Sequence, residues 1–221
     1  MNDTDKPSRT DFLSARLHMI DQQLQRRGIY DSAVLAAMRT VPRHEFVLPE
    51  DMDQAYGDHP LSIGYEQTIS QPYIVASMTQ ELRIDKSSRV LEIGTGCGYQ
   101  TAVLAEICEH VYTVECIPEL LIDASHRLQR LGYSNVTFRI GDGSLGWAEY
   151  APFDGILVAA AAANIPPELM EQLADPGRMV IPVGAHLSNQ QLMLVDKKDT
   201  KITLDELYGV RFVPLRISDV N

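Results

Sequence analysis

A chain of 221 residues with a formal net charge of −11 can bury a substantial core, and its composition is that of an ordinary globular protein. The negative charge argues against a nucleic-acid groove, because phosphate binding needs clustered Lys and Arg. No apolar run approaches the roughly 18 residues of a membrane span, and the polar, acidic start is unlike a signal peptide. We therefore expect a cytoplasmic protein with neither nucleic-acid nor membrane partners.

The three cysteines, Cys97, Cys108 and Cys116, contain no Cys-x-x-Cys pair. Such cysteines are typical of a reducing compartment, where they pack as small apolar groups. Cys108 lies close to His110 in sequence, but two groups of this kind do not make a metal site. We expect no metal ion.

The first third of the chain is expected to be helical, with one long irregular segment. Its elements are a helix over 11–27 ended by Gly28, a helix with Asp31 as N-cap that ends before Pro42, an irregular segment over 43–71, and a helix over 72–82. The apolar face of the first helix consists of Leu13, Leu17, Ile20 and Leu24. A loop as long as 43–71 usually has a task, so it could form a lid or a substrate wall.

From Arg89 onward, strand and helix patterns alternate, which predicts a parallel, doubly wound sheet with right-handed crossovers. The expected strands cover 89–93, 111–115, 136–140 and 154–159, and the expected helices cover 98–108, 118–131 and 166–173. Three further strands, over 178–183, 191–195 and 207–213, are separated by turns over 184–189 and 196–201. Such short connections predict an antiparallel pair at one sheet edge. We expect one domain over 1–221, with a helical and substrate-loop extension over 10–86 and a nucleotide-binding core over 87–216.

The most informative stretch is 89–100, Arg-Val-Leu-Glu-Ile-Gly-Thr-Gly-Cys-Gly-Tyr-Gln. It predicts a buried strand, a glycine turn and a helix start, which is a nucleotide-binding arrangement. The spacing differs from the dinucleotide fingerprint Gly-x-Gly-x-x-Gly, and Glu92 stands inside the strand. The pattern acid-x-Gly-x-Gly-x-Gly resembles motif I of the S-adenosylmethionine (SAM) methyltransferases. A glycine-rich turn in another α/β protein is the alternative.

Ligands of such sheets bind beyond the carboxyl ends of the strands. Glu115 ends the second strand, where a carboxylate can accept both ribose hydroxyls; a plain surface acid is the alternative. Asp142, in Gly-Asp-Gly with Gly143, is expected at the adenine edge, or else in an Asx turn. The small residues 159–163 offer a low wall for a ligand, or simply close helix–strand packing.

Several longer stretches resemble the protein-L-isoaspartate O-methyltransferases. They are Val-Pro-Arg-His-Glu-Phe-Val (41–47), Ala-Tyr-Gly-Asp-His-Pro-Leu-Ser-Ile-Gly (55–64), Gln-Thr-Ile-Ser-Gln-Pro (67–72), Val-Leu-Glu-Ile-Gly-Thr-Gly (90–96), Gly-Asp-Gly (141–143), Ala-Pro-Phe-Asp-Gly-Ile (151–156), Gly-Arg-Met-Val-Ile-Pro-Val-Gly (177–184) and Val-Arg-Phe-Val-Pro-Leu (210–215). The resemblance implies a Rossmann-like SAM-methyltransferase fold and methyl transfer from SAM to the free α-carboxylate of L-isoaspartyl residues in damaged proteins. The ester would close to a succinimide that reopens partly to normal aspartate.

The resemblance also implies roles for individual residues. Ser70 matches the family's active-site serine, and we expect it to orient the substrate carboxylate, which is already ionised at neutral pH and needs no general base. Pro182 and Val183 match a backbone contact for an extended substrate. The expected cofactor-binding residues are Gln67, Thr68, Ile69, Glu92, Gly94, Thr95, Gly96, Gly98, Glu115, Asp142 and Gly143. His44 and His59 are expected to be structural.

Alternatives remain at this point. One is a similar methyltransferase acting on a specific peptide aspartate. Glu66 supports this alternative, because glycine is frequent at this position in the family. Others are a NAD-dependent oxidoreductase, disfavoured by the glycine spacing, and a SAM-binding module without catalysis. A monomer is expected, because no long apolar surface stripe is left unassigned.

Overall fold

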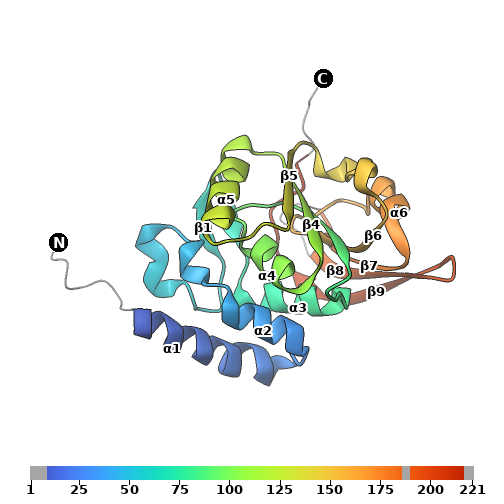
Figure 1. Ribbon diagram of the computed structural model, residues 1–221. Helices are drawn as coiled ribbons and strands as arrows, with labels where there is room; N and C mark the ends of the chain where they lie inside the picture. Colours follow the sequence, from blue (N-terminus) through green and yellow to red (C-terminus); the bar gives the residue numbers. More distant parts are fainter. Residues whose placement is uncertain (1–8, 186–189, 217–221) are drawn as a thin grey trace.

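The computed structural model describes residues 9–185 and 190–216 and is built around one seven-stranded sheet (Figure 1). The strand order is β5-β4-β3-β6-β7-β8-β9. Strands β5, β4, β3, β6 and β7 run parallel to one another, and β8 runs antiparallel to both β7 and β9. The prediction of a doubly wound, mostly parallel sheet with an antiparallel edge is confirmed. The bounds are β3 (Arg89–Ile93), β4 (His110–Glu115), β5 (Val136–Ile140), β6 (Phe153–Val158), β7 (Leu173–Val183), β8 (Gln190–Lys198) and β9 (Lys201–Val210).

Strand β3 lies at the centre of the parallel part and has apolar clusters on both of its faces. Val90 packs in a cluster that includes Leu104 of α4 (Tyr99–Ile107) and Met78 of α3 (Pro72–Leu82). Its neighbour Leu91 packs on the opposite face, in a cluster that includes Leu169 of α6 (Pro167–Gln172). Successive strand residues point to opposite faces, so burial on both sides explains the unbroken apolar run of the sequence.

The N-terminal helices pack on the side of the sheet that carries α3 and α4 (Figure 1). They are α1 (Arg9–Met19), a π-helical turn η1 (Ile20–Leu24), a 3₁₀ turn η2 (Gln25–Arg27) and α2 (Ser32–Thr40). The Asp31 side chain accepts the Ala33 and Val34 backbone N–H groups, so this residue is the predicted N-cap. Gly28 ends η2 with φ of 90°, as expected.

The first helix buries only part of the face predicted for it. Ile20 and Leu24 are buried as predicted, whereas Leu13 and Leu17 are 50% and 43% exposed. Phe12 and Ala15 are the apolar residues of this stretch that pack against the core. The π-helical turn explains the shift, because its wider turn accommodates an additional residue and rotates the preceding helix relative to the core.

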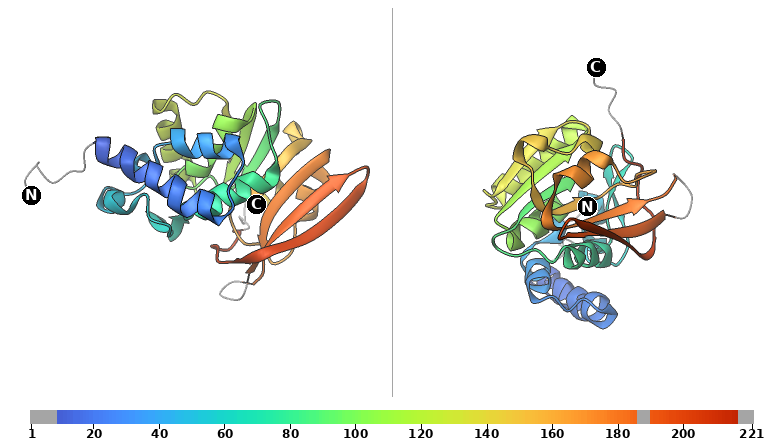
Figure 2. Two further views of the ribbon diagram at one scale, coloured as in Figure 1. Left: turned by 90° about the horizontal axis from the view of Figure 1, so that it is seen from below. Right: turned by 90° about the vertical axis from the view of Figure 1, so that its right-hand side faces the viewer.

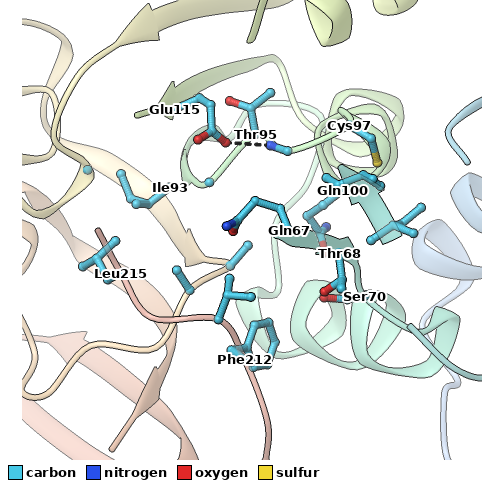
Figure 3. Close-up of a pocket in the computed structure, with 18 of the residues that line it drawn as sticks. Gln67, Thr68, Ser70, Ile93, Thr95, Cys97, Gln100, Glu115, Phe212 and Leu215 are labelled. Carbon is cyan, nitrogen blue, oxygen red and sulfur yellow. Dashed lines mark hydrogen bonds between the residues drawn. The ribbon is translucent and has the colours of Figure 1, made fainter. Parts of the chain in front are cut away.

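The segment expected to be irregular, 43–71, contains regular structure that the sequence pattern did not reveal. It has two 3₁₀ turns, η3 (Arg43–Glu45) and η4 (Pro49–Gln54), and an antiparallel hairpin of β1 (Leu61–Gly64) and β2 (Gln67–Ile69). The hairpin precedes α3 and places Gln67 to Ile69 beside the carboxyl edge of the large sheet, as Figure 3 shows for Gln67 and Thr68.

The last strands are longer than predicted. Strand β8 reaches Lys198 and β9 begins at Lys201, so the turn is confined to two residues rather than 196–201. Asp199 and Thr200 form it with φ of 52° and 62°. The two strands extend beyond the helices that cover the sheet (Figure 2). Residues 186–189 of the other predicted turn lie outside the described residues. Within the described ranges, no helix is long and apolar enough to cross a membrane.

Candidate active site

A pocket opens where β3, β4 and β6 end, against the β1–β2 hairpin (Figure 3). The expected site residues that line it are Gln67, Thr68, Ile69, Ser70, Gly94, Thr95, Gly96, Glu115 and Gly143. Glu92, Gly98, Asp142, Pro182 and Val183 are not among the lining residues. The pocket therefore joins residues from the glycine loop, the second strand end and the hairpin, which are far apart in sequence.

The glycine loop is shaped by backbone conformations that favour glycine. Gly94, Gly96 and Gly98 have φ of 93°, 53° and 88°, a region that other residues enter only at a cost. A Cβ atom at Gly98 would also lie 3.1 Å from Leu128 of α5 (Pro118–Arg130). Gly98 thus allows the turn to form and α5 to pack close to it, although it does not line the pocket.

Glu115 holds the loop and the strand end together. Its Oε2 accepts the Gly96 N–H at 2.8 Å (Figure 3). Its Oε1 accepts the N–H groups of Cys116 and Ile117 at 2.9 and 3.0 Å. These donors stabilise a carboxylate at the pocket wall. A carboxylate fixed in this way can accept hydroxyl groups from a ligand with its remaining lone pairs.

Glu92 lies behind the loop rather than in the pocket. It is fully buried, and its Oε2 accepts the hydroxyls of Thr101 and Thr113, both at 2.6 Å. Its Oε1 has no partner among the described residues. Burial raises the pKa of Glu92 to about 8. The Thr113 hydroxyl also bonds that of Thr95 at 2.7 Å, so a buried chain connects Glu92 to a pocket residue.

The Gly-Asp-Gly turn places Gly143, and not Asp142, in the pocket wall. The Asp142 Oδ1 accepts the backbone N–H and the hydroxyl of Ser144 at 2.8 and 2.7 Å. This is the Asx-type turn that the sequence left open. A Cβ atom at position 143 would lie 2.2 Å from Ile93 Cγ2, so only glycine allows this loop to approach the end of β3.

Ser70 follows β2 and lines the pocket with its hydroxyl unengaged. No residue in the described part of the chain hydrogen-bonds this hydroxyl. The first turn of α3 does not use it, since Gln71 is the N-cap and has no side-chain capping bond. Figure 3 shows Ser70 beside Phe212, across the pocket from Glu115. A free hydroxyl on a pocket wall can donate to an anionic ligand.

The last described residues supply a wall that the sequence reasoning did not assign to the site. Phe212 to Arg216 line the pocket. Their backbone is fixed by two bonds at 2.8 Å, from Ala161 N to Val213 O and from Leu215 N to Ala161 O. The Val-Arg-Phe-Val-Pro-Leu motif was the available signal. Ala159 and Ala160 line the same side, in agreement with the expected low wall.

Pro182 and Val183 take part in other contacts at the end of β7. The Pro182 carbonyl accepts the Ala162 N–H at 3.0 Å, and Val183 pairs with Gln191 of β8. His44 hydrogen-bonds the Tyr56 hydroxyl at 2.7 Å and stacks on Phe12 with ring centroids 4.1 Å apart. It is thus part of the packing of α1. No group of three or more His, Cys, Asp or Glu within 9–185 and 190–216 could hold a metal ion.

This sheet order, with a glycine loop after the central strand and a hydrogen-bonded acid at the end of the next, defines a Rossmann-like nucleotide-binding fold. The spacing acid-x-Gly-x-Gly-x-Gly from Glu92 to Gly98 is typical of the methyltransferase class. A family model for protein-L-isoaspartate(D-aspartate) O-methyltransferase matches residues 14–219. The chain belongs to this family.

Individual relatives and solved structures of the same family are similar to this chain. The chain is 58% identical over 200 residues to the protein-L-isoaspartate O-methyltransferase of Opitutus terrae, covering 90% of this chain and 85% of that one. It is 51% identical over 217 residues to that of Picosynechococcus, covering 96% and 97%. A solved protein-L-isoaspartate O-methyltransferase superposes with a TM-score of 0.80 at 31% identity, over 90% of this chain and 65% of that longer one. A Plasmodium falciparum beta-aspartate methyltransferase (PCMT), in complex with S-adenosyl-L-homocysteine, gives 0.79 at 26% identity, over 94% and 99%.

Proposed function

We propose that this enzyme transfers a methyl group from SAM to the free carboxylate of L-isoaspartyl residues in damaged proteins and peptides. The family model and relatives of 50% identity and more carry the assignment of the reaction. The observation on this chain that supports it best is the unengaged Ser70 hydroxyl in the same pocket as the glycine loop and Glu115. One pocket therefore offers both a cofactor wall and an anion-binding hydroxyl.

The residues of the pocket fit SAM as donor. Glu115 would accept the two ribose hydroxyls, and Gly94 to Gly96 would hold the amino-acid end with backbone groups. Gly143 would face the adenine, and Gln67 to Ile69 would border the reacting methyl group. When bound, SAM supplies an electrophilic methyl carbon on a sulfonium. Glu92 and Asp142 would act indirectly, through the Thr113–Thr95 bonds and through the turn that presents Gly143.

The task of the protein side chains is to position the acceptor. The substrate carboxylate is ionised at neutral pH, since its ordinary pKa is roughly 3–4, so no base has to remove a proton. Ser70 would donate to one carboxylate oxygen and leave the other directed at the methyl carbon. Alignment of this kind can supply on the order of 7–11 kcal/mol of the barrier. The end of β7, at Pro182 and Val183, is the proposed contact for the substrate backbone.

We further propose that residues 1–221 act as one domain, as a monomer in the cytoplasm, with neither nucleic-acid nor membrane partners. One apolar cluster supports a single unit, because it joins Met19 and Met38 of the N-terminal extension to Tyr99 and Leu128 of the core. The formal charge of −11 argues against nucleic acid. In gel filtration, a mass near twice that of one chain would contradict the monomer.

The repair outcome is tested by long incubation of an L-isoaspartyl peptide with the enzyme and SAM. The ester should close to a succinimide, and chromatography should show the normal aspartyl peptide accumulating over many rounds. A reaction without SAM is the control. Methylation of an ordinary aspartyl peptide, with the isoaspartyl peptide left unmodified, would instead establish the peptide-aspartate alternative.

A further inference from the structure

The mouth of the pocket is bridged by an ion pair between segments 150 residues apart. Arg216 Nη2 lies 3.3 Å from Glu66 Oε2. Glu66 is at the tip of the β1–β2 hairpin, next to the pocket residue Gln67, and Arg216 lines the pocket itself. The pair therefore lies at the edge of the pocket that also contains Ser70.

The hairpin tip holds Glu66 in an unusual backbone conformation. Tyr65 and Glu66 have φ of 54° and 60°, and they connect Gly64 to Gln67, which pair across the hairpin. Two central residues with positive φ are the pattern of a type I′ turn, which normally takes Asn and Gly. An acid here costs conformational energy, and neither the turn nor the core needs its side chain, which is 90% exposed.

Arg216 is the one lysine or arginine among the described lining residues. Its backbone is held in place by the neighbouring bond from Leu215 N to Ala161 O. Its side chain is 46% exposed, so the guanidinium lies at the boundary between pocket and solvent. In a chain with a formal charge of −11, this guanidinium places a positive charge at the pocket mouth, where it can attract a carboxylate.

The pair is weak enough to exchange. Ion pairs between solvent-exposed side chains contribute about 0–1 kcal/mol, because water screens the charges and both side chains lose freedom. A carboxylate brought by a substrate can therefore replace the Glu66 carboxylate on Arg216 at little cost. The exchange conserves the number of ion pairs, and Glu66 needs no new partner because its side chain is already 90% exposed.

We propose that Arg216 is a specificity-determining residue that binds an acidic side chain flanking the isoaspartyl residue, and that Glu66 is its internal competitor. This inference rests on the proposed function. Glu66 reduces the affinity that an acidic flanking residue adds, since the carboxylate of the substrate must first displace Glu66 from Arg216. The two residues together set how strongly the enzyme prefers acidic surroundings of the damaged site.

The test compares three L-isoaspartyl peptides that differ in one flanking residue, Glu, Gln or Lys, and reads the ratio of their KM values. Arg216→Gln should raise the KM of the Glu peptide relative to the Gln peptide about fivefold. Glu66→Gln should lower the ratio of the KM of the Glu peptide to that of the Gln peptide about threefold when Arg216 is present, and should leave this ratio unchanged when it is combined with Arg216→Gln.

Salt of about 0.5 M should remove the differences in KM between the peptides, because the Debye length falls to a few ångströms. Arg130→Gln, which breaks an exposed pair with Glu45 away from the pocket, is the matched control.

Two results would overturn the inference. If the ratio of the KM values of the Glu and Gln peptides is the same in the wild type and Arg216→Gln, Arg216 does not bind the flanking acidic side chain. An equal effect of Glu66→Gln with and without Arg216 would show that Glu66 simply repels acids and does not compete. Absence of turnover with all three peptides in the wild type would instead be a failure of the proposed function, so the two failures are distinguishable.

Discussion

The Glu115 carboxylate accepts the Gly96 backbone N–H at 2.8 Å, and this bond fastens the glycine loop after β3 to the end of β4. The sequence places these residues 19 positions apart, on a strand end and in a turn that each have little structure alone. The bond fixes the position of the glycine loop in the pocket wall. It also leaves the carboxylate facing the pocket, where its remaining lone pairs can accept hydroxyl groups.

Glu115→Gln should weaken SAM binding about 10- to 100-fold. Hydrogen bonds to a charged group are worth about 1.5–3 kcal/mol, and an amide loses the charge and turns one acceptor into a donor. Isothermal titration of the free enzyme with SAM measures the effect. Glu119→Gln, an exposed acid in the first turn of α5, is the control. An unchanged Kd in Glu115→Gln would remove Glu115 from the cofactor site.

Ser70→Ala should lower kcat about 10- to 100-fold while the Kd of SAM stays within twofold of the wild type. The hydroxyl has no structural partner among the described residues, so its loss should remove substrate orientation and little else. Ser125→Ala provides a control, because its exposed hydroxyl bonds only within α5. If Ser70→Ala keeps full turnover, Ser70 has no part in orienting the carboxylate.

Glu92→Gln should raise the free energy of unfolding at pH 7. In the folded chain the pKa of Glu92 is raised from 4.5 to about 8, so between these values folding takes up a proton. The stability of the wild type is therefore fully present below pH 4.5 and declines as the pH rises towards about 8. A neutral amide avoids this loss, which is on the order of 3 kcal/mol at pH 7.

Urea unfolding of the wild type and Glu92→Gln at several pH values checks this pH dependence. The free energies of unfolding of the two proteins should differ least at acidic pH, and the advantage of Glu92→Gln should grow as the pH rises. A difference that is independent of pH would mean that Glu92 is ionised in the folded protein, in conflict with its burial.

Gly143→Ala should destabilise the protein more than Gly141→Ala, although both glycines flank Asp142. A Cβ atom at 143 would lie 2.2 Å from Ile93 Cγ2, whereas at 141 its nearest neighbour is Arg139 Nε at 3.6 Å. Overpacking of this kind costs about 1–3 kcal/mol. Thermal melts compare the two variants, and titration with SAM should show weaker binding only for Gly143→Ala. Equal melting temperatures would contradict the close approach of this loop to β3.

Local patterns predicted much of this fold, and tertiary contacts decided the rest. The strand, turn and helix over 89–107 were predictable because burial on both faces and the glycine spacing are encoded within the segment itself. The β1–β2 hairpin was not, since its strands are short and Tyr65 and Glu66 carry no turn signal. The shifted face of the first helix depends on a π-helical turn that apolar spacing does not reveal.

The same distinction applies to the site. Ser70, Glu115 and Gly143 were identified from motifs and strand ends, and the structure brings them to one pocket. Glu92 was expected at the cofactor, but hydroxyls from two other elements, Thr101 and Thr113, hold it in the core. The wall formed by 212–216 depends on bonds to Ala161, a partner that sequence distance conceals.

The most direct test of the central claim is methyl transfer from labelled SAM to two synthetic peptides that differ only in one L-isoaspartyl or L-aspartyl linkage. The assignment predicts base-labile label on the isoaspartyl peptide and none on the aspartyl peptide. Label on the aspartyl peptide alone, or on neither peptide while titration confirms SAM binding, would contradict it.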